Sequence, residues 1–196
     1  MKYKSRKNLT VAGSVTLVLV IIDQFTKYLA SAYLKGQPPV ALIEDVFELH
    51  YLENQSAAFS MDPVSLFQKI FQIRYFIENP SAYVRFKMIF FVVLTVIVVY
   101  FLIRLYIRIP DARRFRYLNW ILVAFTAGAI GNCIDRLIHN YVIDFFYFKL
   151  IDFPVFNVAD IYVTVSAIFL IVLGIFYYKE TDYEQIFPAK HKKEHS

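Results

Sequence analysis

The sequence predicts an all-α membrane protein with four transmembrane helices, a small extracytoplasmic β-containing segment and an amphipathic interfacial helix. Apolar residues make up 58% of the 196 residues and charged residues only 19%, which is less than the roughly one quarter typical of soluble domains. The apolar residues also gather in four long runs. A single cysteine, Cys133, cannot form an intramolecular disulfide, so a secreted disulfide scaffold is excluded together with intrinsic disorder.

Each of the four runs is long enough to cross a membrane, for which a helix needs about 20 residues. Backbone groups in lipid must be satisfied within their own segment, so helices are expected. The third run turns polar toward its end, while the others are nearly continuous. The four predicted spans cover residues 11–34, 88–107, 117–138 and 158–178.

The basic residues predict the orientation of these spans. Of the 21 lysines and arginines, 13 lie in the amino-terminal tail, the second connection and the carboxy-terminal tail, which share one side. The positive-inside rule then places both termini in the cytoplasm. A cleaved signal peptide ending at Ala30-Ser31-Ala32 is the alternative for the first span. We favour a retained span because Asp23 and Lys27 interrupt it and its removal would spoil the charge alternation.

The first outer connection, about 35–85, contains a predicted strand and a predicted helix. Residues 47–51 alternate apolar and polar side chains, which is typical of a strand. Asp62-Pro63 resembles a helix start, and apolar residues then recur at helical spacing to residue 77. This amphipathic helix either lies on the outer leaflet or over a site, or packs on the protein's own outer segment.

Two further segments complete the chain. The second outer segment, 140–156, is rich in phenylalanine, and aromatic rings gather at membrane interfaces. The predicted organisation is one four-helix membrane domain over 1–178, with the outer insertion at about 35–85. A charged cytoplasmic tail follows over 179–196, and its lack of apolar periodicity predicts little order.

Charged residues within the spans are expensive in a bilayer and are therefore candidates for function. Asp23 and Lys27 lie four residues apart on one face of the first span, as an ion pair that fixes helix packing or as part of a site. The third span combines small residues with Asn132, Asp135 and Arg136 within one turn. This polarity beside a small-residue contact favours a site over a purely structural network.

Asp144 and Asp160 are the candidate catalytic pair. The predicted topology places both near the outer membrane surface, and the sixteen residues from one to the other allow the chain to fold back. Two carboxylates at a partly desolvated site cannot both ionise cheaply, so one becomes an acid and the other a base. Alternatively, Asp160 only caps the fourth helix and Asp144 is a solvated loop acid.

Other chemistries lack their residues. The four histidines show no metal-ligand spacing, and the sequence has neither a nucleophile elbow nor a phosphate-binding glycine loop. A competing class is a non-enzymatic membrane carrier or scaffold with a polar seam. Such a protein would explain Asp23, Lys27 and Arg136, but not two aspartates that meet at the outer surface.

Five motifs, taken in order on a four-span frame, resemble the lipoprotein signal peptidase (signal peptidase II) family. The resemblance covers nearly the whole chain from about residue 10 to residue 178. The motifs are Asp23-Gln24-x-x-Lys27, Asn54-x-x-Ala57-Ala58-Phe59, Gly128-x-x-Gly131-Asn132-x-x-Asp135-Arg136, Val142-x-Asp144-Phe145 and Phe156-Asn157-x-Ala159-Asp160.

The resemblance implies a membrane-embedded aspartyl peptidase of the bacterial inner membrane, with its active site at the outer leaflet. It implies removal of the signal peptide from diacylglyceryl-modified prolipoproteins by cleavage before the lipidated cysteine. Asp144 and Asp160 map onto the family's catalytic pair. Its substrate-binding and structural polar residues map onto Asp23, Lys27, Asn54, Gly128, Asn132, Asp135, Arg136, Asn157 and Ala159.

The expected partners follow from the same resemblance. They are the lipidated prolipoprotein, membrane lipid and globomycin-type inhibitors, with no nucleic acid, no cofactor and no metal, and the protein is expected to be a monomer. Two glycines of the family pattern are replaced here by Ser56 and Asn140. Asparagine tolerates the left-handed conformation, so the second turn can survive. The segment 61–83 is longer than the resemblance leads us to expect.

Overall fold

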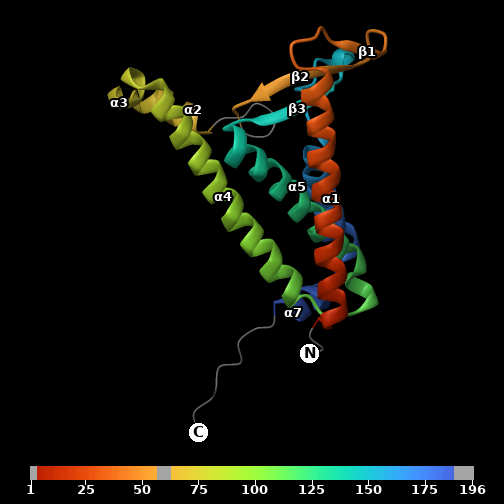
Figure 1. Cartoon of the computed structure of the whole chain (residues 1–196). Coiled ribbons are helices and arrows are strands. Elements are labelled where there is room, and N and C mark those ends of the chain that lie inside the picture. Colours follow the sequence, from red (N-terminus) through yellow and green to blue (C-terminus); the bar gives the residue numbers. More distant parts are fainter. Residues whose placement is uncertain (1–3, 57–62, 188–196) are drawn as a thin grey trace.

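A computed structural model describes residues 4–56 and 63–187 (Figure 1). Four long helices form the body of the molecule, and a small sheet lies across one end. The helices that are long and apolar enough to span a membrane are α1 (Arg6–Tyr33), α4 (Pro80–Arg108), α5 (Arg116–His139, with the preceding turn η2, Arg113–Phe115) and α6 (Val158–Val172, continued by η4, Leu173–Tyr177). The predicted four-helix membrane fold is confirmed.

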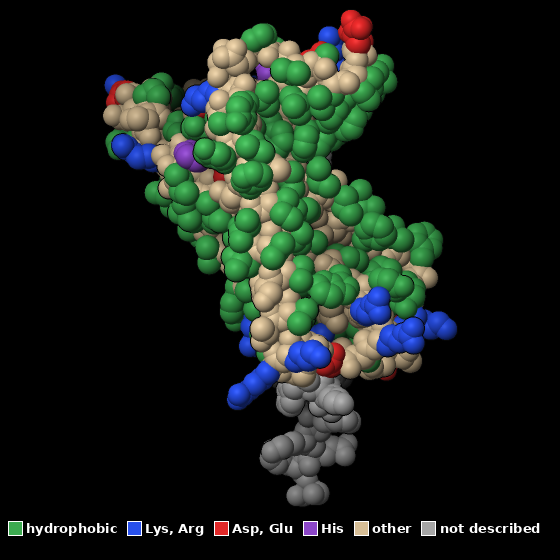
Figure 2. Space-filling model, turned by 45° about the vertical axis from the view of Figure 1, so that its right-hand side comes forward, with side chains coloured by type: hydrophobic (Ala, Val, Ile, Leu, Met, Phe, Trp, Pro, Cys, Tyr) green, Lys and Arg blue, Asp and Glu red, His purple; other side chains and the backbone are tan. Residues whose placement is uncertain are grey.

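The side chains on the outside of the bundle are those of a membrane protein. Ile89 and Phe101 of α4 are each 63% exposed, and Phe25 of α1 is 57% exposed. Figure 2 shows apolar side chains over the middle of the molecule and basic side chains gathered at its lower end. Large apolar side chains that face outward along the spans would be costly in water and are favourable in lipid.

The sheet at the upper end has three antiparallel strands in the order β1-β2-β3. Residue 144 stands opposite Leu52 in the β2–β3 pairing. The predicted strand at 47–51 is confirmed and extends further, whereas β1 and β3 were not predicted. The strands are β1 (Val40–Ile43), β2 (Phe47–Asn54) and β3 (Val142–Tyr147).

The sheet is held on the bundle by a small core. Ile143 and Phe145 of β3 are buried against Ala30 near the end of α1. Helix α5 ends at His139, and the residue that caps it, Asn140, has a left-handed φ of 62°, so the chain can turn at once into β3. This confirms the expectation that asparagine can replace the glycine of the family pattern at this turn.

The predicted helix over 61–77 is wrong as a single element. Helix α2 (Pro63–Phe71) is followed by α3 (Arg74–Glu78). The break falls at Gln72, whose φ of 43° is incompatible with a continuous right-handed helix. Pro80 does not only end this run, because it also begins α4, eight residues before the predicted start of that span. Asp62, the predicted cap, lies outside the described residues.

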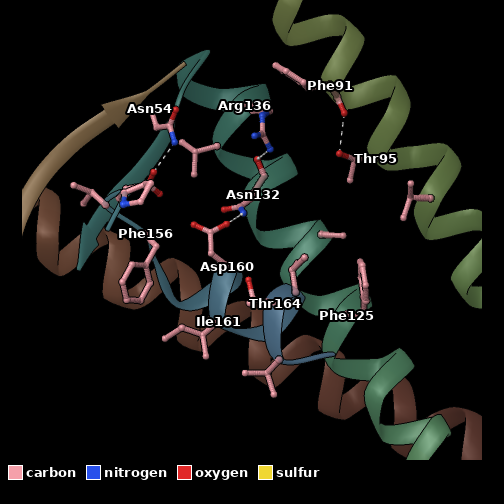
Figure 3. A pocket seen from close by; sticks show the side chains of 18 of the residues that line it. Asn54, Phe91, Thr95, Phe125, Asn132, Arg136, Phe156, Asp160, Ile161 and Thr164 are labelled. Carbon is pink, nitrogen blue, oxygen red and sulfur yellow. Dashed lines mark hydrogen bonds between the residues drawn. The ribbon is translucent and has the colours of Figure 1, made fainter. Parts of the chain in front are cut away.

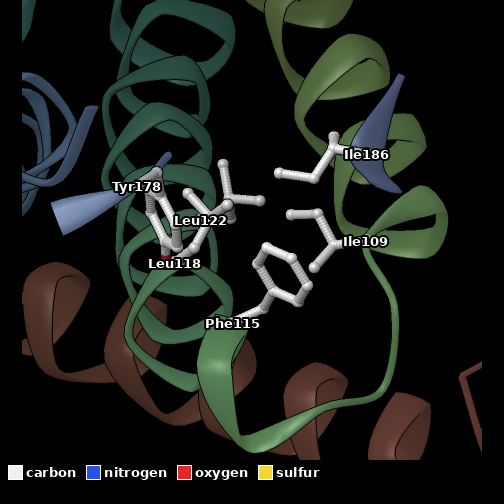
Figure 4. Packing of buried hydrophobic residues seen from close by; sticks show 6 residues of the cluster. All are labelled: Ile109, Phe115, Leu118, Leu122, Tyr178 and Ile186. Atoms are coloured by element: carbon white, nitrogen blue, oxygen red, sulfur yellow. The ribbon is translucent and has the colours of Figure 1, made fainter. Parts of the chain in front are cut away.

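The opposite end of the bundle has its own core, in which six side chains from four segments pack together (Figure 4). They are Ile109, Phe115, Leu118, Leu122, Tyr178 and Ile186. Ile186 belongs to α7 (Glu180–Ile186), in the tail for which little order was predicted. Sequence periodicity missed α7 because its anchor is distant in the chain: the Arg114 guanidinium lies 2.9 Å from a carboxylate oxygen of Asp182.

Candidate active site

The two aspartates approach each other because the segment between them folds back. Phe146 and Phe156 exchange backbone hydrogen bonds of 2.8 and 2.9 Å, which brings the end of β3 next to the start of α6. Asp144 is the third residue of β3, and Asp160 is the third residue of α6. Both side chains line the same cavity. Asp144 is only 1% exposed, so the alternative of a solvated loop acid is wrong.

Amide groups hold both oxygens of Asp144. Asn54 at the end of β2 donates to Oδ2 at 2.8 Å, and Asn157 donates to Oδ1 at 2.6 Å. Each amide is a neutral donor, so it stabilises an oxygen of the carboxylate without adding a positive charge.

Asp160 receives a similar pair of donors. The side-chain amide of Asn132 donates to Oδ1 at 2.8 Å (Figure 3), and the backbone N–H of Asn157 donates to Oδ2 at 3.2 Å. The second bond belongs to a capping box, in which the Asn157 side chain in turn accepts from the Asp160 N–H. Asp160 therefore caps the fourth helix, as one alternative predicted, and also faces the cavity.

The amide orientations are determined by what their oxygens accept. Asn54 Oδ1 accepts the N–H of Ser56 at 2.7 Å. Asn132 Oδ1 accepts from the Lys27 ammonium at 2.8 Å and from the Asn157 amide at 3.2 Å. Because these oxygens already accept hydrogen bonds, the NH₂ groups must point toward the carboxylates.

The environment raises the pKa of Asp144 from its ordinary value of 3.8 to about 7. Burial is the largest cause, because it penalises the charged form, and the nearby Asp160 carboxylate adds to it. The hydrogen bonds from Asn54 and Asn157 act in the opposite direction. At neutral pH the pair can therefore hold one proton between two carboxyl groups.

A buried ionic cluster lies behind the two aspartates. The Lys27 ammonium is 2.9 Å from Asp23 Oδ2 and 3.0 Å from Asp135 Oδ2, and all three side chains are at most 2% exposed. The other oxygen of Asp23 accepts the N–H of Ala159 at 2.9 Å. This cluster joins α1, α5 and the first turn of α6, so it positions the elements that carry Asn132 and the second aspartate.

Arg136 lines the cavity beside the two aspartates. Its guanidinium donates to the carbonyl oxygens of Asn132 and Ser56, both at 3.3 Å. The guanidinium carbon lies 5.2 Å from the ring centroid of Phe91 on α4, within the range of a cation–π contact. Its buried Nε has no hydrogen-bond partner in the described part of the chain. Arg136 therefore retains donor capacity for a ligand.

Two glycines let α5 meet its neighbours closely. A methyl group on Gly128 would lie 2.5 Å from the carbonyl oxygen of Ala159, and one on Gly131 would collide with the Asp23 carboxylate. Ala159 is fully buried at this contact. The predicted small-residue contact is confirmed, and it sets the distance between α5 and the start of α6.

The cavity has a volume of about 490 Å³ and runs between α4, α5 and α6. Asp144 and Asp160 line its polar end, and the remainder is mostly apolar (Figure 3). The apolar walls come from α4, the middle of α5 and the first two turns of α6, as well as from the segment 153–156. The lining residues away from the aspartates are Phe91, Leu94, Thr95, Val98, Phe125, Ala129, Phe153, Pro154, Val155, Phe156, Ile161, Val163, Thr164 and Val165.

The predicted site residues fall into two groups. Asn54, Asn132 and Arg136 line the cavity with the two aspartates. The other six support it from behind: they are Asp23, Lys27, Gly128, Asp135, Asn157 and Ala159. The sequence did not predict which residues of α4 line the cavity. They are apolar like the lipid-facing residues of the same helix, and only Thr95 among them is polar. In the described residues, no cluster of histidine, cysteine and acidic side chains could hold a metal ion.

Comparison with known proteins agrees with this geometry. The profile of the family described as Signal peptidase (SPase) II matches residues 15–176. The lipoprotein signal peptidase of Caldanaerobacter subterraneus subsp. tengcongensis is 39% identical over 83% of this chain and 94% of its own length. This chain belongs to the signal peptidase II family.

One further lipoprotein signal peptidase and two solved structures extend the comparison. The lipoprotein signal peptidase of Brevibacillus brevis is 34% identical over 83% of this chain and 92% of its own length. A bacterial membrane enzyme solved by the in meso method at 1.9 Å has a TM-score of 0.67 at 25% identity, covering 91% of this chain and 99% of that one. A second one, at 2.3 Å, has a TM-score of 0.64 at 26% identity, with coverages of 89% and 91%.

Membership of signal peptidase II makes this chain a peptidase that acts in the removal of signal peptides from lipoproteins. The four apolar helices are those of a multi-pass membrane protein. The competing class, a carrier or scaffold without enzymatic activity, is thereby set aside.

Proposed function

We propose that this signal peptidase II is an aspartic endopeptidase in which Asp144 and Asp160 act together on water. It cleaves a diacylglyceryl-modified prolipoprotein immediately before the lipidated cysteine. One observation carries the proposal: two carboxyl groups share one largely apolar cavity, and each is held by amide donors rather than by a cation.

The chemistry needs one proton on the pair. One carboxylate takes a proton from water, whose oxygen attacks the scissile carbonyl carbon, while the other carboxyl group gives its proton to the carbonyl oxygen. Collapse of the tetrahedral intermediate breaks the C–N bond, and the new amine takes up a proton. The raised pKa of Asp144 keeps this proton available at neutral pH. We assign no fixed roles, because a coupled pair titrates as a unit.

The apolar part of the cavity is suited to the lipid that the substrate carries. Side chains such as Leu94, Val98 and Phe125 continue from the aspartates toward the bilayer core. Acyl chains on the substrate cysteine would contact these walls as they would contact lipid. The free donors of Arg136 and the second hydrogen of the Asn54 amide are suited to peptide carbonyl oxygens.

The cleavage site lies at the outer leaflet in this proposal, with both termini in the cytoplasm. The positive-inside rule supports this orientation. The sheet that carries Asp144 lies at the upper end of the bundle (Figure 1), opposite the end where the basic side chains gather (Figure 2). A globomycin-type inhibitor would compete for the same cavity. We expect neither a cofactor nor a partner subunit to be required.

The decisive experiment is cleavage of a lipidated precursor by the purified protein and by its Asp144→Asn and Asp160→Asn variants. Each variant should lose turnover while its melting temperature stays within a few degrees, because loss of a desolvated charge offsets weakened hydrogen bonds. The matched control is Asp152→Asn, an exposed acid of the same outer segment that does not line the cavity. Substantial turnover in either catalytic variant, or loss of activity on chelation that a metal restores, would contradict the proposal.

A further inference from the structure

A second cavity, of about 330 Å³, lies at the opposite end of the molecule from the aspartates. It is enclosed by the start of α1, the end of α4 with the connection that follows it, and the first two turns of α5. The exposed Arg113, Arg116 and Trp120 form its rim. Its lining residues are Lys4, Asn8, Val11, Ala12, Tyr106, Asp111, Ala112, Arg113, Arg116, Asn119, Trp120 and Val123.

The charges around this cavity are unbalanced. Lys4, Arg113 and Arg116 are positive and Asp111 is the single acid in the lining, so two positive charges remain. Asp111 is already engaged, since both its oxygens accept from the Asn8 amide at 2.8 and 2.7 Å. Neither guanidinium, of Arg113 or of Arg116, has a hydrogen bond or ion pair within the described parts of the chain, 4–56 and 63–187. Both guanidiniums are therefore available to an anion.

Lys4 shows that the cavity is built rather than merely lined by surface chains. Its residue is 8% exposed, and its ammonium lies 4.7 Å from the ring centroid of Tyr106 on α4. Burial lowers the pKa of this lysine, although Asp111 opposes the shift. An anion in the cavity would compensate the cost of keeping this cation out of water.

The remaining walls identify the kind of anion. Val11, Val123 and Trp120 form an apolar side, and Trp120 is 44% exposed at the start of a membrane-spanning helix. Asn119 adds a buried amide oxygen that has no donor in the described residues. A ligand that combines a phosphodiester, a hydroxyl donor and an acyl chain satisfies all three features, whereas inorganic phosphate has no apolar part to contact Val11, Val123 and Trp120.

We propose that this cavity binds the headgroup of an anionic phospholipid with a glycerol headgroup, in the leaflet next to the basic end of the helices. The phosphodiester lies between Arg113 and Arg116, as basic pockets between membrane helices hold lipid headgroups. A headgroup hydroxyl donates to Asn119, and the acyl chains leave along Trp120. This site is separate from the peptidase cavity, and its leaflet follows from the orientation proposed above.

The chain's single tryptophan, Trp120, reports directly on this site. The full-length protein is placed in phosphatidylcholine nanodiscs that contain small fractions of a quencher lipid. The quencher is a nitroxide on the acyl chain near the glycerol, carried by phosphatidylglycerol, phosphatidylethanolamine or phosphatidylcholine. Phosphatidylglycerol should quench at a several-fold lower mole fraction than the other two, because each basic residue near the surface contributes about fivefold in affinity for an anionic lipid.

Two charge-matched variants decide the origin of the preference. Arg113→Gln/Arg116→Gln should abolish it, while Arg6→Gln/Lys7→Gln, which removes two exposed charges from the same end without touching the cavity, should leave most of it. Equal losses in both variants would mean general surface attraction and would overturn the proposal. Equal quenching by phosphatidylethanolamine, or full displacement by millimolar inorganic phosphate, would overturn it as well. Precursor cleavage by all variants should be unchanged, so failure here is distinguishable from failure of the aspartic mechanism.

Discussion

Replacement of Gly128 by alanine should disable the enzyme by moving α6 and not by removing a chemical group. The added methyl would lie 2.5 Å from the carbonyl oxygen of Ala159, 2.9 Å from a methyl of Val163 and 3.1 Å from Cβ of Tyr162. The nearest atom is backbone, and the first turn of α6 is held by its capping box. It cannot rotate away, so restoring an ordinary contact requires a shift of roughly 1 Å between the two helices.

The expected losses of stability and of cleavage rate follow from the residues that this shift displaces. Overpacking a well-packed contact costs about 1–3 kcal/mol, partly offset by up to about 1 kcal/mol from alanine's better helix propensity. Asp160 follows Ala159 directly, so it would move relative to Asn132 and to the other aspartate. A misplacement of about 1 Å in an active site can cost about 10²-fold in rate. We expect cleavage to fall by that order while the melting temperature falls by only a few degrees.

The assay compares precursor cleavage and thermal melting of Gly128→Ala with those of Gly13→Ala. A methyl on Gly13 would meet nothing within 4 Å, so this control introduces the same side chain into a spanning helix without a contact. It should cleave normally and melt at the same or a slightly higher temperature. If Gly128→Ala cleaved and melted like the control, the close approach would not position Asp160, and the reasoning would be refuted.

Three further predictions follow from the site and its surroundings. Lys27→Met should destabilise the protein by about 3–5 kcal/mol, because it leaves two buried carboxylates without their cation. Thermal melting measures this loss against Lys35→Met, which removes a lysine from an exposed ion pair that contributes little to stability. The kcat/KM should fall as the pH rises through about 7, because the aspartate pair then loses the one proton that the reaction needs. Replacing both Phe67 and Phe71 of α2, which are 49% and 62% exposed, with serine should raise KM at nearly unchanged kcat if α2 covers the lipidated substrate.

Each of these predictions has an outcome that would contradict it. Equal melting of the two lysine variants would show that the buried cluster is not held by its cation. The pH effect has a second signature: a carboxyl group whose pKa is raised from 3.8 to about 7 makes the native state lose stability as pH rises through that window. Asp144→Asn should remove this slope from the melting temperature. Unfolding of the double phenylalanine variant at unchanged KM would show that α2 is packing.

The sequence predicted the features that the bilayer imposes on the chain, and it did not predict elements that are held by contacts between distant segments. The four spans were predictable because a helix needs about 20 apolar residues to cross a bilayer. Asp144 and Asp160 were predictable candidates because a charged side chain in or near a bilayer costs free energy and is therefore rare without a role. Strand β3 was not predicted, because its first four residues are all buried and therefore show no polar alternation. Helix α7 was missed for a different reason, since Arg114 anchors it from a distant part of the chain.

Boundaries in the outer insertion were also beyond sequence patterns. Apolar residues recur at helical spacing from 61 to 77, yet the helix is interrupted at Gln72, where the sequence has neither glycine nor proline. The apolar lining of α4 is similar: its residues face a cavity or lipid according to the angle at which α4 diverges from α1 toward the upper end of the molecule (Figure 1). Periodicity on one helix cannot encode the angle between two.

Amide groups rather than cations contact the two aspartates, and this choice of residue type suits the chemistry. A cation in direct contact with both aspartates would favour the doubly ionised pair and remove the proton that the reaction needs. Asparagine amides orient the carboxylates without a positive charge, and burial outweighs the lowering effect of their hydrogen bonds on the pKa of Asp144. A buried cation, Lys27, lies close by. It donates to Asn132 Oδ1, while the NH₂ group of the same amide donates to Asp160. The ammonium thus fixes the direction of the amide while its charge stays one side chain away from the proton.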